Sequence, residues 1–182
     1  FFFDYSEYII PFAWLTVGFF LVFLVKKVLG CTSWQGPADA IYCAHRPDKD
    51  MDIRQGFGTV LAAFTSLSAG ASLGQYGPIV HMGALIGGLF KKYNLSSIHL
   101  SNDIFLGCGV AAAISAGFQA PIAGVIFAHE AILRHFSVRA IAPIAISSIC
   151  AASVGEWLNL SDNILALDFY PEPLIKQVPA LL

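Results

Sequence analysis

The sequence predicts an all-α integral membrane protein, because it has few charges and gathers its apolar residues into long runs. Of its 182 residues, 57% are hydrophobic and only 12% are charged, whereas charged residues make up roughly a quarter of an ordinary soluble domain. Several uncharged runs reach the length that a helix needs to cross a bilayer. We therefore expect a multi-pass integral membrane protein and leave open which membrane it occupies.

The first uncharged run covers residues 8–25 and reads YIIPFAWLTVGFFLVFLV. It has the length of one membrane span and predicts a transmembrane helix that stops near Gly30. Residues 44–54, AHRPDKDMDIR, form the most charged segment of the chain. We interpret that segment as a solvated loop.

The next uncharged run, residues 55–90, is too long for one straight helix. Gly70, Gly74 and Gly77, followed by Pro78, interrupt it near its middle. This pattern predicts two helical pieces that meet within the membrane.

Two further apolar runs continue the same pattern. Residues 104–129 are interrupted at Gly117 and Pro121, and residues 140–155 form the last run. The Gly83-x-x-x-Gly87 spacing predicts close contact between helix backbones, since small residues let helices approach each other.

The interruption before Pro78 also predicts a binding site. Proline favours the first turn of a helix, so we expect a helix to begin at Pro78. The free N–H groups at such a start need a partner inside a membrane, and an anion can supply it. Gly74 and Gly77 would let a ligand approach the backbone, and Gly36 with Pro37 has the same form. Two such turns can converge on one anion, although similar proline kinks also occur in membrane helices that bind no ion.

The sequence gives little support for a nucleic-acid-binding protein, a metalloprotein or an enzyme. The net charge of −2 and the lack of a basic run argue against a nucleic-acid partner. HEAILRH, residues 129–135, has Leu133 where a zinc-binding HExxH motif needs its second histidine. We expect no enzyme, no metal site and no cofactor, and we interpret the widely spaced cysteines as buried apolar residues: Cys31, Cys43, Cys108 and Cys150.

Three segments resemble motifs of the CLC chloride channel and transporter family. GQYGPIVHMGALIGG, residues 74–88, resembles its Gly-Arg-Glu-Gly-Pro motif and the helix behind it. GVAAAISAGFQAPIAGVIFAHE, residues 109–130, is similar to its Gly-Ala-Ala-Ala-Gly and Phe-Asn-Ala-Pro-Leu-Ala-Gly-Ile-Leu-Phe stretches, which a pair of glutamates follows. FLVKKVLGCTSWQGP, residues 23–37, resembles the helix end before its Gly-Ser-Gly-Ile-Pro turn.

The resemblance implies a fold and a set of partners. Each family subunit is an antiparallel pair of helical repeats with its own pore, and two subunits form a homodimer. Residues 1–182 then correspond to a partial transmembrane domain, the first repeat of broken, tilted helices, with the second repeat absent from this chain. Chloride or another small anion is the implied substrate, and the lipid bilayer and a second copy are the implied partners. We do not expect this piece to conduct alone, because the second repeat supplies part of the central anion site.

The family's anion site carries over to particular positions. Its coordinating serine falls at Trp34 by counting back from Pro37, or at Ser33 if one residue is inserted, so this register stays open. The resulting anion-binding candidates are Ser33, Gly36, Gly74, Tyr76, Gly77, Pro78 and Ile79.

The chain departs from the family at both proton-handling positions. The gating glutamate falls at Tyr76, and a tyrosine with a pKa of about 10 cannot titrate as a carboxylate does near neutral pH. The inner proton-transfer glutamate falls at Ala131, and Glu130 matches the first glutamate of the pair. The resemblance therefore implies a passive channel of the voltage-gated type, with Tyr76 as its gate.

Two other interpretations remain open. One is a proton/anion exchanger with displaced proton groups, in which Glu130 is a possible proton path. The other is a non-conducting relative whose pore Tyr76 has closed. The Tyr76 ring can project into the pore, swing aside, or pack against neighbouring helices. We interpret His81 as a packed, hydrogen-bonded histidine.

Overall fold

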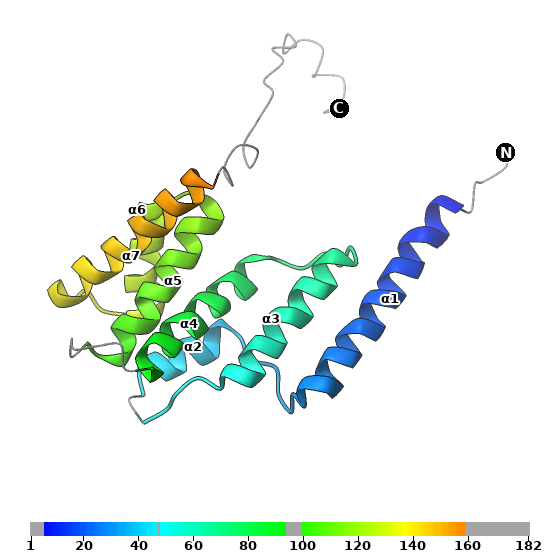
Figure 1. Ribbon diagram of the computed structural model, residues 1–182, viewed down its shortest axis with the longest axis horizontal. Helices are drawn as coiled ribbons and strands as arrows, with labels where there is room; N and C mark the ends of the chain where they lie inside the picture. Colours follow the sequence, from blue (N-terminus) through cyan, green and yellow to red (C-terminus); the bar gives the residue numbers. More distant parts are fainter. Residues whose placement is uncertain (1–5, 47, 94–99, 159–182) are drawn as a thin grey trace, which may run out of the picture.

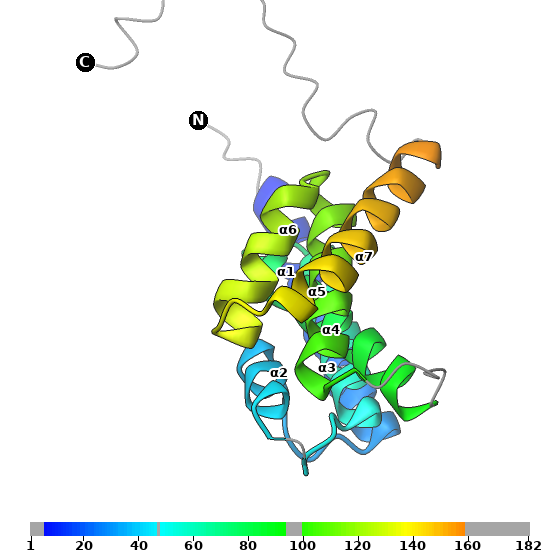
Figure 2. The same cartoon turned by 90° about the vertical axis from the view of Figure 1, so that its left-hand side faces the viewer.

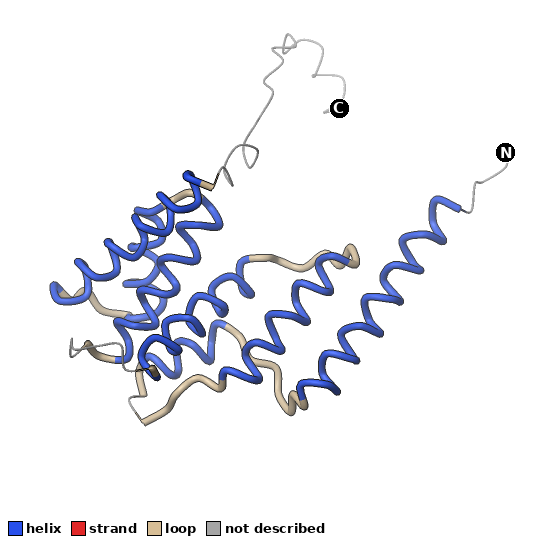
Figure 3. Tube along the Cα trace, in the orientation of Figure 1, coloured by secondary structure: helices blue, strands red, loops and turns tan. Residues whose placement is uncertain are grey.

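The computed structural model describes residues 6–46, 48–93 and 100–158. All regular structure in these ranges is helical (Figure 3), which confirms the predicted all-α class; residues 159–182 of the expected domain lie outside the described ranges. The helices are α1 (Ser6–Leu29), α2 (Pro37–Ala44), α3 (Ile53–Ser68), α4 (Tyr76–Lys92), α5 (Asn102–Phe118), α6 (Pro121–Phe127), the π-helix η1 (Ala128–Leu133) and α7 (Val138–Trp157).

The helices α1, α3, α4 and α5 follow one another across the fold, each in contact with the next (Figure 1). The helices α6 and α7 pack against α5 and against each other. The short α2 contacts α4, α5 and η1, and in Figure 2 it lies below the segment formed by α6 and η1. Residues from both the early and the late part of the chain therefore meet around α4 and α5.

The first helix presents an apolar surface with little protein around it. Only 6% of its apolar window Phe12–Leu29 is buried, and the side chains of Phe12 and Phe19 are 71% and 77% exposed. Large exposed apolar surfaces of this kind mark contact with a membrane or with another protein. Helix α1 and helix α7 (Val138–Trp157) are the two described helices that are long and apolar enough to cross a membrane.

The predicted interruptions are present, but two of them are displaced. Helix α3 ends at Ser68 and α4 begins at Tyr76, two residues before the expected start at Pro78. Proline fits there because a residue in the first turn needs no N–H for the helix hydrogen bonds. The second break falls at Gln119, whose φ of 52° is left-handed, whereas Gly117 remains inside α5.

The backbones of α4 and α5 touch at glycines. A Cβ atom placed on Gly83 would lie 2.5 Å from the carbonyl oxygen of Gly109, and one on Gly87 would collide with the backbone of Phe105. No larger side chain fits at these positions. The prediction of close helix packing at Gly83 and Gly87 is confirmed.

Serine hydroxyl groups join α5 and α7. The Ser115 hydroxyl donates to the carbonyl oxygen of Ser148 at 2.7 Å. The Ser148 hydroxyl in turn donates to the carbonyl oxygen of Pro121, at the start of α6, at 2.8 Å. Such bonds between helices suit an apolar environment, because they leave no hydroxyl without a partner.

The glycine contact predicts a difference between two neighbouring substitutions on α4. Gly83→Ala should destabilise the full-length protein by about 1–3 kcal/mol, because its methyl group has to push α5 away. Gly88→Ala is the matched control, since its Cβ would meet only the Cβ of Met51, at 4.0 Å. Thermal unfolding in detergent should give a lower melting temperature for Gly83→Ala alone, and equal melting temperatures would contradict the described contact.

Candidate anion site

Two helix starts lie side by side in this fold. Helix α2 begins at Pro37 after the N-cap Gly36, and α4 begins at Tyr76 after the N-cap Gln75. A Cβ atom on Gly77 would lie 3.8 Å from Cγ of Pro37. The sequence analysis allowed these two turns to converge, and the structure brings them together.

A cavity of about 130 Å³ lies between the two starts. Helix α3 closes it on a third side, and its volume is large enough for water molecules or a small anion. Its lining residues are Gln35, Gly36, Pro37, Thr59, Val60, Ala63, Gly77, Pro78 and His81.

His81 holds the two starts together. Its side chain is only 1% exposed, and its Nδ1 lies 3.0 Å from the carbonyl oxygen of Gly36. Because a carbonyl oxygen can only accept, Nδ1 carries the proton in this bond. The structure agrees with the interpretation of a packed, hydrogen-bonded histidine and adds that its partner is the N-cap of α2.

Two buried acceptor atoms come from residues that line the cavity. Oε1 of Gln35 and Nε2 of His81 have no hydrogen-bond partner within the described ranges. In a neutral ring with its proton on Nδ1, Nε2 is an acceptor. Buried polar atoms normally have partners, so water in the cavity would satisfy both. Sequence reasoning missed Gln35, whose only signal is its position directly before Gly36 and Pro37.

The two starts differ in how their amides are used. Gln75 makes no side-chain cap, and the first turn of α4 has no acidic residue. No hydrogen bond from the N–H of Tyr76 or Gly77 is found in the described part of the chain. At α2, by contrast, the N–H of Gly36 donates to Oδ2 of Asp39 at 2.7 Å. The start of α4 is therefore open, whereas the start of α2 is capped at Gly36, with the N–H of Ala38 left without a partner in the described part of the chain.

Neither candidate for the coordinating serine position lines the cavity. The exposed Ser33 hydroxyl donates to Oε1 of Gln55 on α3 at 2.6 Å. The ammonium group of Lys26 lies 5.8 Å from the ring centroid of Trp34. Both side chains are engaged with neighbouring helices.

Three further candidates, Gly74, Tyr76 and Ile79, also lie outside the cavity lining. A Cβ atom on Gly74 would meet nothing within 4 Å, so the backbone of this linker is accessible. The N–H of Ile79 donates to the carbonyl oxygen of Gln75 at 3.2 Å. The Ile79 amide is thus used within the helix, unlike the amides of Tyr76 and Gly77.

Tyr76 belongs to an aromatic cluster. Its ring meets Phe127 of α6 edge to face, with 5.3 Å between centroids, and lies 6.4 Å from Phe118 at the end of α5. The Tyr76 side chain is still 41% exposed. The ring packs on neighbouring helices and keeps part of its surface open.

Glu130 lies away from the junction of α2 and α4. It is exposed on the π-helix η1 and does not line the 130 Å³ cavity. Its neighbour His129 is 1% exposed, and its Nδ1 bonds the carbonyl oxygen of Val125 at 2.9 Å. The His129 ring stacks on Phe136 with 5.2 Å between centroids.

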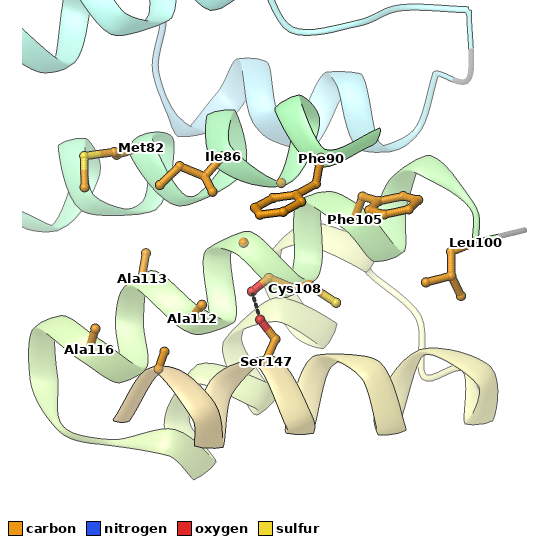
Figure 4. A pocket seen from close by; sticks show the side chains of 13 residues that line it. Met82, Ile86, Phe90, Leu100, Phe105, Cys108, Ala112, Ala113, Ala116 and Ser147 are labelled. Carbon is orange, nitrogen blue, oxygen red and sulfur yellow. Dashed lines mark hydrogen bonds between the residues drawn. The ribbon is translucent and has the colours of Figure 1, made fainter. Parts of the chain in front are cut away.

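A larger cavity of about 510 Å³ lies between α4, α5 and α7 (Figure 4). Its walls are almost entirely apolar, with Met82, Ile86 and Phe90 on the α4 side. The Ser147 hydroxyl in this wall donates to the carbonyl oxygen of Cys108 at 3.0 Å. No charged side chain lines this cavity, so its walls provide little electrostatic attraction for an anion.

Comparison with known proteins identifies the family. The model of the voltage gated chloride channel family matches residues 17–182, which is most of the chain. The chain belongs to this family. The resemblance carried by the three sequence motifs is thereby confirmed.

Two individual members of the voltage gated chloride channel family show low sequence identity with this chain. A ClcB-like chloride channel protein of Ralstonia nicotianae is 28% identical over 107 residues, covering 57% of this chain and 25% of the relative. The voltage-gated ClC-type chloride channel ClcB of Escherichia coli is 27% identical over 105 residues, 58% of this chain and 25% of the relative. The match thus spans about a quarter of each relative's length. No solved structure shows a significant match.

The bond between His81 and Gly36 predicts which substitutions the site tolerates. His81→Leu should destabilise the full-length protein by about 1 kcal/mol, because the donor is lost. His81→Asn should recover most of this loss, because its amide nitrogen occupies the place of Nδ1. His81→Gln reaches the place of Nε2 and should not recover it. Thermal unfolding in detergent separates the three variants, and an Asn variant no more stable than Leu would contradict the assignment.

Proposed function

We propose that the parent protein of this chain transports small anions, with chloride as the first candidate, past the junction of α2 and α4. One observation carries the proposal: two helix starts, at Pro37 and Tyr76, meet at one cavity in a member of a chloride channel family. Each start contributes the positive end of a helix dipole. The curated relatives, which are named as chloride channels, support the same substrate class.

The open start of α4 is the stronger attraction for an anion. The N–H groups of Tyr76 and Gly77 have no described partner, and no carboxylate lies in the first turn of α4. In surroundings of low dielectric such groups interact with an anion far more strongly than in water. Gly77 has no side chain beyond a hydrogen atom, which leaves room for an anion to approach them.

We infer passive conduction rather than exchange for protons. Tyr76 stands at the gating position and Ala131 at the inner proton position, and neither side chain titrates near neutral pH. Glu130 and Tyr76 both lie outside the lining of the 130 Å³ cavity, so this inference rests on the residue types at the two positions. An exchanger that uses Glu130 as a displaced proton path is the alternative.

The aromatic cluster favours a second candidate, a relative that does not conduct. Phe118 and Phe127 hold the Tyr76 ring beside the start of α4, and a ring held there can close the path. In our proposal the ring moves with this cluster and acts as the gate. We assign no enzymatic activity to the protein.

The complete transporter needs more than this chain. The matched part covers about a quarter of each relative, so we propose that the rest of the parent completes the anion site. We further propose a multi-pass arrangement, in which the shorter apolar helices accompany α1 and α7 through the bilayer, and a homodimer with one pore per subunit.

Flux measurements on the full-length parent in liposomes test this function. Native protein should release chloride without stoichiometric proton uptake, because no side chain at the gating position exchanges protons. Proton movement coupled to chloride would overturn the passive mechanism and direct attention to Glu130. Absence of any anion flux would favour the non-conducting alternative.

Substitution of Tyr76 tests its role as the gate. Tyr76→Glu should introduce block that is relieved as pH falls, because a carboxylate beside the α4 amides competes with chloride until it is protonated. Tyr76→Phe is the matched control and should conduct at every pH at which the native protein does. If Tyr76→Glu has the same pH profile as Tyr76→Phe, the residue lies outside the pathway.

A further inference from the structure

The start of α2 carries its own carboxylate. The N–H of Gly36 donates to Oδ2 of Asp39 at 2.7 Å, the short length expected when the acceptor is charged. The N–H of Asp39 returns a bond to the carbonyl oxygen of Gly36 at 3.0 Å. Pro37 has no N–H, so the start of α2 offers the N–H groups of Gly36 and Ala38, and Asp39 occupies that of Gly36.

Open space borders the Cα atom of Gly36. A Cβ atom on Gly36 would meet nothing within 4 Å, and Gly36 also lines the cavity shared with the start of α4. The Asp39 side chain is exposed, so it can rotate away without leaving a packed interior. A small anion could therefore replace the carboxylate at Gly36.

His81 keeps this amide at the junction. Its Nδ1 donates to the carbonyl oxygen of Gly36. The carbonyl group of Gly36 is therefore bonded to a side chain of α4, while its N–H group donates to Asp39. At α4 the amides of Tyr76 and Gly77 have no acidic residue in the first turn to take them. Of the two helix starts that meet here, α2 alone has a carboxylate of its own first turn on one amide, that of Gly36, while the N–H of Ala38 has no partner in the described part of the chain.

We propose that the Asp39 carboxylate is a resident competitor of the transported anion at the start of α2. It rests on Gly36 when the junction is empty, and an arriving anion has to displace it before both starts can bind that anion. This inference rests on the proposed anion transport. A competitor of this kind weakens the binding of the transported anion and speeds its release. Conduction requires such weak binding, because the ion has to leave the site again.

The competitor model predicts a gain in binding when the carboxylate is removed. In the full-length parent, Asp39→Ala should lower the half-saturating chloride concentration for flux by roughly threefold to tenfold, in line with charge effects at helix starts. The maximal flux should fall, since chloride leaves more slowly. Asp39→Asn keeps an acceptor for Gly36 without the charge and should give a smaller shift in the same direction, even if Asp39→Ala fails to fold.

The matched controls are Asp52→Ala and Asp52→Asn. Asp52 caps α3 by accepting from the N–H groups of Arg54 and Gln55, and it does not line the cavity between α2 and α4. Asp39 does not line this cavity either, but its partner Gly36 does, whereas the partners of Asp52 do not. The Asp52 variants lose a helix cap away from the cavity, so their half-saturating chloride concentration should equal that of the native protein.

Calorimetric titration of chloride, made alongside the flux measurement, separates the outcomes. Tighter chloride binding by the Asp39 variants alone supports the competitor. Native flux with unchanged or weaker binding in both Asp39 variants shows a local helix cap only and overturns the inference, while anion transport stands. A native protein that neither binds nor transports chloride overturns both.

Discussion

The backbone amides at the starts of α2 and α4 need partners, and this need shapes the centre of the fold. The two starts lie together with Gly77 beside Pro37, and the bond from His81 to the carbonyl oxygen of Gly36 joins them. The glycine contact between α4 and α5 then holds the other side of α4, and the serine bonds between α5 and α7 extend the same support. The arrangement aims the positive ends of two helices at one cavity, which is the physical basis for binding an anion without a basic side chain.

The two starts are not equivalent, and their difference gives the site its proposed behaviour. Helix α2 begins with a reciprocal pair of bonds between Gly36 and Asp39, whereas α4 begins without a side-chain cap. In our proposal the open start attracts an anion, and the carboxylate at the start of α2 limits how tightly it is held. Tyr76 stands beside the open start in an aromatic cluster, so a neutral ring takes the place at which the family resemblance puts a carboxylate.

Much of this arrangement follows from local sequence, and the rest depends on distant contacts. The uncharged run at residues 8–25 predicted α1, and the prolines marked both helix starts because proline fits a first turn. The break before Pro121 was predicted, but it was placed at Gly117 rather than Gln119, because a left-handed residue at a helix end leaves little trace when it is not glycine. The bond from His81 to Gly36 spans 45 residues, and no periodicity reveals such a partner. The cap by Asp39 was visible in principle, since an acidic residue three positions after an N-cap is a known spacing.

The most direct test is to locate the anion in the full-length protein. Crystals grown with bromide in place of chloride would show the ion by its anomalous scattering. The account predicts a bromide peak between the starts of α2 and α4, within hydrogen-bonding distance of the amide nitrogen of Gly77 or Tyr76. Bromide peaks elsewhere in the protein, with none at this junction, would contradict it.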